Sequence, residues 1–162
     1  MKLLIIYLKI IYLFFFLLMK VYAEETIPID ITSDEMQWDD NKRIANAIGN
    51  AVAIQGNKKI TAAKLIVYLE KNNDNNEIIL IKAEGNVVFT SIDEIATGKI
   101  ATYDLVKNNI VIENNVTLKK NDNIMKGEIL KIDFNTGISQ INNKKESKKV
   151  KMRFLPKKSD KK

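Results

Sequence analysis

Adjacent carboxylates are the residues of this chain best suited to acid–base chemistry, and we consider three pairs: Asp34-Glu35, Asp39-Asp40 and Asp93-Glu94. A neighbouring acid and base can share a proton-transfer step. Adjacent residues of an extended strand point to opposite faces, however, so such pairs diverge. We therefore interpret all three pairs as solvated turn residues and expect no catalytic residue in this sequence.

The residue types that most enzymes and metal sites need are missing. The chain has 162 residues with no cysteine and no histidine. This excludes disulfides and thiolate-bound zinc or iron–sulfur centres, and it removes the commonest general base and metal ligand. Asp122 to Glu128 is too short for a calcium-binding loop, and no phosphate loop or dinucleotide fingerprint occurs. We expect a protein that is not an enzyme and holds no cofactor or metal.

The first 23 residues predict a secretory signal peptide. Ile10 to Leu18 is an unbroken apolar run, and Val21-Tyr22-Ala23 ends the segment in a pattern suited to cleavage. We therefore expect cleavage before Glu24 and export of the mature chain.

The alternative for this segment is a retained anchor helix that begins near Leu3. Lys9 interrupts that longer apolar run. The clean run that remains is well short of the roughly 20 apolar residues that span a bilayer.

Charge is unevenly distributed along the chain, whose net charge is +6. The segment from Lys144 to Lys162 holds nine lysines and one arginine against two acidic residues, whereas residues 24–143 are net acidic. A basic tail favours contact with a polyanion, and export favours a lipid or glycolipid phosphate over nucleic acid. The alternative is a solvated, disordered tail, which we expect for residues 157–162.

Apolar residues between Ile29 and Ile141 alternate with polar ones, which predicts antiparallel strands with one buried face. The segments Leu130 to Phe134 and Tyr103 to Leu105 show this alternation clearly. Residues that tolerate a positive φ separate the runs, and we interpret them as turns. They are Gly49-Asn50, Gly85-Asn86, Asn108-Asn109, Asn114-Asn115 and Thr136-Gly137. At typical strand and turn lengths the mature chain holds about 15 strands.

A repeat underlies the strands. The segments 31–54, 60–89, 96–118 and 125–141 each read as a hairpin, with marker asparagines (Asn50, Asn86, Asn115) about 30 residues apart. A single hairpin cannot bury its apolar face, so successive hairpins must stack into one structure.

The order of these motifs resembles the periplasmic lipopolysaccharide-transport family of LptA-type bridge proteins, which carry an organic-solvent-tolerance N-terminal domain. The matching segments are Pro28-Ile29-Asp30-Ile31-Thr32-Ser33-Asp34, Gly49-Asn50-Ala51-Val52 with Gln55-Gly56, Ile60-Thr61-Ala62-Ala63-Lys64, Gly85-Asn86-Val87, Lys126-Gly127-Glu128 and residues 148–156. The chain departs from the family at Ala63, where an acidic residue is usual, and at Asn114-Asn115, where glycine-asparagine is usual.

The resemblance implies an all-β, open-ended, V-shaped antiparallel β-jelly roll over residues 24–156. It implies a non-enzymatic periplasmic carrier that holds the acyl chains of lipopolysaccharide (lipid A) between apolar walls. The implied partners are an LptC-like inner-membrane protein, an LptD-like outer-membrane translocon and further copies of the chain, head to tail.

Alternation and the family's inward-facing positions together select ten wall candidates. They are Ile29, Ile31, Val52, Ile54, Phe89, Tyr103, Leu105, Leu118, Leu130 and Ile132. The alternative for each is an ordinary sandwich-core residue. For the whole chain, two alternatives stay open: a membrane-anchored LptC-like partner, and a structural β-repeat surface protein.

The ends of the stack are the expected contact points with partners. An unpaired edge strand is a template for another strand. The segments 27–31 and 150–155 are the natural edges, and their apolar residues are Ile27, Val150, Met152 and Phe154. We expect these two edges to form head-to-tail junctions.

Overall fold

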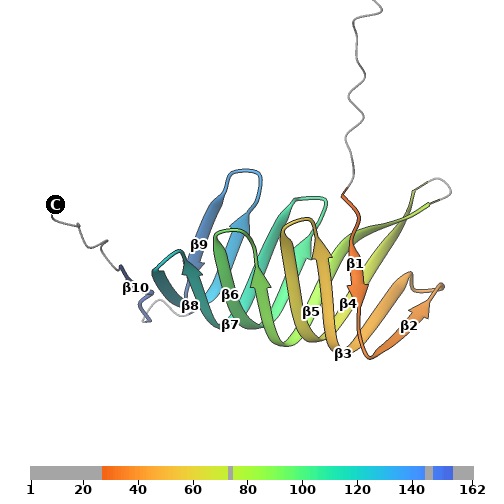
Figure 1. Ribbon diagram of the computed structural model, residues 1–162, viewed down its shortest axis with the longest axis horizontal. Helices are drawn as coiled ribbons and strands as arrows, with labels where there is room; N and C mark the ends of the chain where they lie inside the picture. The colour runs from red at the N-terminus through yellow and green to blue at the C-terminus, as the bar shows by residue number, and fades with distance from the viewer. Residues whose placement is uncertain (1–26, 73–74, 145–147, 155–162) are drawn as a thin grey trace, which may run out of the picture.

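The computed structural model describes residues 27–72, 75–144 and 148–154, and it contains only strands and their connections (Figure 1). The expected signal peptide, the tail 157–162 and Leu155 lie outside the described residues. The ten strands are β1 (Asp30–Thr32), β2 (Glu35–Asp39), β3 (Ile44–Gln55), β4 (Lys58–Asn72), β5 (Asn75–Thr90), β6 (Glu94–Asp104), β7 (Asn109–Lys120), β8 (Asn123–Asp133), β9 (Ile138–Asn142) and β10 (Lys151–Arg153).

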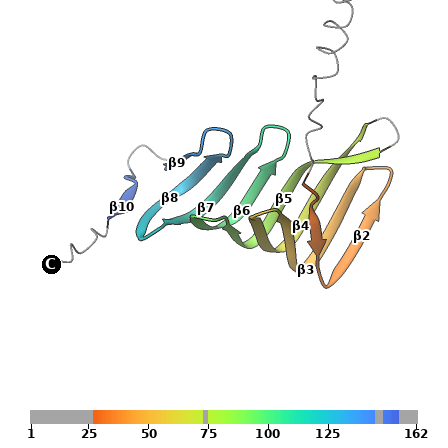
Figure 2. The same ribbon diagram turned by 45° about the horizontal axis from the view of Figure 1, so that its top comes forward.

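All ten strands form one antiparallel sheet, and hairpin follows hairpin along the long axis of the molecule (Figures 1 and 2). The order is β1-β3-β4-β5-β6-β7-β8-β10, with β2 also paired to β3 and β9 also paired to β8. The expected open-ended all-β jelly roll of stacked hairpins is confirmed. Strands β3 to β8 are 11 to 16 residues long, however, so the described chain has ten strands and not about 15.

Each long strand shifts register near its middle, and the shifts line up across the sheet. We call this row of residues the fold line. Strands β3, β5 and β7 each insert two residues there, and β4, β6 and β8 each insert one. The inserted residues are Gly49-Asn50, Gly85-Asn86 and Asn114-Asn115 in the first set, and Ala63, Lys99 and Glu128 in the second.

The sequence-based interpretation of three turns was therefore wrong. All six inserted residues of β3, β5 and β7 have positive φ, between 43° and 80°. Residues that accept this conformation suit a tight turn and a β-bulge equally well. Here they bend a continuous strand, whereas Asn108 and Gly137 do lie in hairpin turns, as expected.

The fold line divides the sheet into two arms that face each other across an apolar interior. Arm A contains β2, β9 and the segments Ile44–Ile48, Lys64–Tyr68, Leu80–Glu84, Ile100–Asp104, Asn109–Glu113 and Ile129–Asp133. Arm B contains β1, β10 and the segments Ala51–Gln55, Lys58–Thr61, Val87–Thr90, Glu94–Thr97, Val116–Lys120 and Asn123–Gly127. The side away from the fold line, where the arms end in hairpin turns, is here called the mouth.

The number of inserted residues keeps the apolar side chains on the inner face of both arms. Two inserted residues preserve the alternation along β3, where Ala47 and Ala51 are both buried. One inserted residue reverses it along β4, where buried positions change from Ile60 and Ala62 to Leu65. Successive side chains of a strand point to opposite faces of the sheet. The number of inserted residues therefore has to suit the spacing between the apolar residues before and after the insertion.

We predict that Asn115→Val destabilises the fold by about 1–2 kcal/mol, the cost of holding an ordinary side chain in the left-handed region. Asn115 is exposed and has a φ of 57°, so packing does not enter the comparison. Asn115→Gly is expected to be neutral or stabilising. The same Asn→Val change at exposed Asn142, inside β9, is the control. Chemical denaturation measures all three, and equal effects at both positions would contradict the bulge assignment.

Candidate functional site

The interior between the arms contains most of the expected wall residues. Phe89, Tyr103, Leu118, Leu130 and Ile132 are at most 5% exposed and belong to one continuous apolar cluster. Ile29, Ile31 and Leu105 pack against that cluster and are partly buried. Sequence alternation thus located the inner face at eight of the ten positions.

Val52 and Ile54 were placed on the wrong face. Ile54 is 40% exposed, and Ala51 and Ala53 take the inward positions of β3 instead. The reason lies in the neighbouring strands: Ala53 stands in register between Ile31 of β1 and Ile60 of β4. Two large neighbours fill the space above a small residue, so the larger Val52 and Ile54 point outward.

Beside Tyr103 the described residues leave no open slot between the walls. The side chains of the two arms pack against one another, and the apolar crevice beside Ile29, Ile81 and Tyr103 measures about 10 Å³. That volume holds at most one water molecule. A larger cavity, of about 370 Å³, lies at the mouth between the turns near Asp93 and Gly137. Among the described residues the interior is therefore packed beside Tyr103, whereas it is hollow at the mouth beside Ile132 and Phe134.

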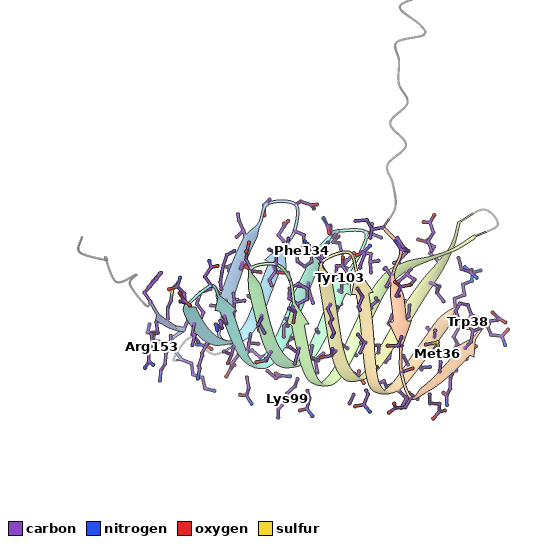
Figure 3. All side chains as sticks on the ribbon, viewed as in Figure 1. Met36, Trp38, Lys99, Tyr103, Phe134 and Arg153 are labelled. Carbon is purple, nitrogen blue, oxygen red and sulfur yellow. The ribbon has the colours of Figure 1, made fainter. Side chains whose placement is uncertain are left out.

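Arm B ends at the mouth in polar side chains. In β3, β4, β6 and β7 the innermost inward positions are apolar, and the position nearest the mouth is Gln55, Lys58, Glu94 or Lys120. Arm A places Tyr103 and Phe134 opposite them, and both lie near the top of the molecule in Figure 3. The mouth is thus lined by polar groups on one side and aromatic rings on the other.

Glu94 is the one buried charged residue of the described chain, with 6% exposure. Its carboxylate Oε1 accepts hydrogen bonds from Lys120 Nζ at 2.7 Å and from Ser139 Oγ at 2.8 Å. Our interpretation of the Asp93-Glu94 pair as solvated was therefore wrong for Glu94. Its place two residues before buried Ala96 was a usable signal, since residues two apart share a strand face.

The aromatic rings at the mouth form a small cluster centred on Phe134. The Phe134 ring centroid lies 5.7 Å from that of Phe89 and 5.8 Å from that of Tyr103. Lys58 Nζ lies 4.8 Å from the same centroid, in a cation–π contact. The Tyr103 hydroxyl donates to Gln55 Oε1 at 2.6 Å, and burial raises the pKa of this phenol.

The two ends of the stack carry exposed apolar residues on the inner face. At the N-terminal end, Met36 and Trp38 of β2 are 53% and 54% exposed, although they stand in register with buried Ala47 and Ala45. At the other end, Met152 of β10 is 49% exposed. Met36 and Trp38 lie at one extremity of Figure 3 and Arg153 at the other.

The expected edge residues are all exposed, but the edges themselves differ from the prediction. Ile27, Val150, Met152 and Phe154 are 39–66% exposed. Only Met152 lies within a strand, because β1 and β10 are each three residues long. The sequence analysis did not identify β2 and β9 as the edge strands of arm A at the two ends.

Among the described residues, no helix is long and apolar enough to cross a membrane, and no group of three metal-ligating side chains is present.

Comparison with known proteins begins with an uncharacterized protein from Rhizobium meliloti (strain 1021), to which this chain is 27% identical over 120 residues. The match covers 70% of this chain and 64% of that protein, so the chain spans less than two thirds of its relative's length. The fold is also similar to the crystal structure of LptH from Pseudomonas aeruginosa, described as the LptA homologous periplasmic component of the lipopolysaccharide transport device. The TM-score is 0.71 at 20% identity, with 80% of this chain and 96% of that chain covered.

Residues 30–138, from β1 to the start of β9, match the family described as LptA/(LptD N-terminal domain) LPS transport protein. This match takes in strands β1 to β8, with the fold line. The chain therefore belongs to the LptA/(LptD N-terminal domain) family of lipopolysaccharide transport proteins.

Proposed function

We propose that this protein is a non-enzymatic periplasmic carrier that holds the acyl chains of lipopolysaccharide between its two arms. The observation that carries the proposal is the inner face, which is apolar from β3 to β8 and borders a polar rim at the mouth. An amphiphile fits that arrangement, with its chains inside and its charged head at the mouth. Each acyl methylene moved from water to the interior contributes about 0.8 kcal/mol.

The protein acts as one segment of a bridge from the inner to the outer membrane. Export by the N-terminal signal peptide, residues 1–23, places it in the periplasm. Its neighbours in the bridge are an LptC-like inner-membrane protein, an LptD-like outer-membrane translocon and further copies of itself. N-terminal sequencing of the exported protein tests this assignment against the anchored alternative, because a start at Glu24 requires cleavage.

Strand direction supports head-to-tail stacking. Translating a copy along the long axis brings its β2 beside β9 and its β1 beside β10. Strands β1 and β2 run antiparallel to β3, and β9 and β10 run antiparallel to β8. Because β3 and β8 themselves run in opposite directions, both new pairs are antiparallel. The stack would thus continue both arms at once and cover the exposed Met36, Trp38 and Met152.

Charge supports the same arrangement. The N-terminal end carries Asp30, Glu35 and Asp39, whereas β10 carries Lys151 and Arg153. Opposite charges on the two ends favour the head-to-tail contact and disfavour contact between two like ends.

Lipid A should quench or shift the fluorescence of Trp38, the chain's one tryptophan, because Trp38 lies on the inner face at the open N-terminal end. We expect Ile31→Asp, which places a charge on the same face, to weaken lipid A binding at least tenfold. Thr32→Asp, on the outer face of the same strand, is the matched control. Equal binding by the two variants would contradict the inner face as the site, and no binding by the wild-type protein would overturn the proposed function.

Met152→Asp should weaken self-association at least tenfold, because it places a charge on the apolar inner face of the β10 edge. Lys149→Ala, an exposed residue outside the strand, is expected to change little. Deleting residues 150–162 should abolish association. Sedimentation at several concentrations measures all three, and unchanged oligomers after the deletion would refute the junction.

A further inference from the structure

Three contacts that join the arms across the mouth are here called the clasp: Gln55 with Tyr103, Phe89 with Phe134, and Glu94 with Ser139. Lys58 of arm B also reaches arm A, over the Phe134 ring. We propose that the clasp is a gate, which opens to let an acyl chain pass between the arms and closes behind it. This inference rests on the proposed function, because it concerns access to the same interior.

The clasp is regular along the stack. In each contact a residue of arm B meets a residue from the strand three places further along the chain on arm A: β3 meets β6, β5 meets the end of β8, and β6 meets β9. The contacts therefore lie in a row along the length of the mouth, in steps that follow the strands. The row extends from β3 to β9, and two of its residues, Glu94 and Phe134, line the cavity of about 370 Å³ at the mouth.

The interior is closed tightly enough that access requires motion. Phe89 and Tyr103 are 1% and 5% exposed, and the apolar crevice beside Tyr103 is about the size of a water molecule. An acyl chain cannot enter beside these side chains while the clasp is closed. Separation of the arms at the mouth would give a chain access to this part of the interior.

Separation of the arms breaks few bonds, because strand pairing runs within each arm and the arms are joined through the fold line. The polar clasp residues also keep or regain partners. Gln55 and Tyr103 would meet water or the polar head of the lipid at the mouth. Glu94 would lose Ser139 but keep Lys120, which belongs to its own arm. No polar group is left buried and unpaired, which is the costly outcome in most core rearrangements.

A reversible cross-link between the two arms is the sharpest test, because the chain has no native cysteine that would react with the linker. The pair Gln55→Cys and Tyr103→Cys is joined with a reducible bis-methanethiosulfonate linker, which ties the arms together. The pair Thr97→Cys and Thr117→Cys, in register on the outer face of arm B, is joined in the same way as the control. The probe is purified lipid A, and binding is measured by native mass spectrometry before and after reduction.

We expect the cross-mouth linker to reduce lipid A loading at least tenfold, reduction to restore it, and the same-arm linker to leave it unchanged. Equal loading of the cross-mouth protein before and after reduction would overturn the gate while leaving the proposed function standing. Binding by none of the proteins, wild type included, would overturn the proposed function and the gate with it.

A second variant tests the gate without a linker. Tyr103→Phe keeps the ring in the wall and removes the hydrogen bond to Gln55, so the rate of lipid A loading should rise about five-fold. Tyr68→Phe, on the outward face of β4, is the control and should leave the rate unchanged. A loading rate equal to that of the wild type in Tyr103→Phe would contradict a role for this hydrogen bond in the clasp.

Discussion

A row of β-bulges is the constraint on which the rest of this structure depends. Without it, strands of up to 16 residues would form one extended sheet with an apolar face open to water. The paired positive-φ residues of β3, β5 and β7, such as Gly85-Asn86, and the single insertions of β4, β6 and β8 bend the long strands at the same level and turn the sheet onto itself. A single sheet thereby supplies both walls of its own core, and no second sheet or helix is needed to cover it.

The same geometry leaves two kinds of opening. The ends of the stack have unpaired edges, because each end is bordered by two strands that have one neighbour apiece: β1 and β2 at the start, β9 and β10 at the finish. The mouth is bridged only by side chains from the two arms, such as Gln55 and Tyr103. A carrier for an amphiphile needs an apolar interior that continues into the next protein at each end and that the amphiphile can enter from the side. A bent, open-ended sheet offers both.

Prediction of the inner face succeeded where apolar and polar residues alternate and failed where both alternating sets are apolar. Leu130 and Ile132 alternate with Lys131, so only one phase was plausible. In β3, alanines alternate with Val52 and Ile54. The larger size of Val52 and Ile54 favoured them as the inward-facing residues, which was wrong. Burial of Ala53 follows from its neighbours in register, which lie on other strands and far away in the sequence. Glu94 was misjudged for the same reason, because Lys120 and Ser139 are distant in the chain.

The sequence by itself determined the all-β class, the stacked hairpins and most of the inner face, since a period of two and turn-forming residues are local properties. It also limited the chemistry, because a chain without cysteine or histidine lacks the usual reactive groups. Only the tertiary structure decided whether Asn114-Asn115 ends a strand or bends it, since both conformations place asparagine in the left-handed region. The contacts across the mouth, too, were settled only in three dimensions, because side chains such as Gln55 and Tyr103 meet only after the sheet has folded onto itself.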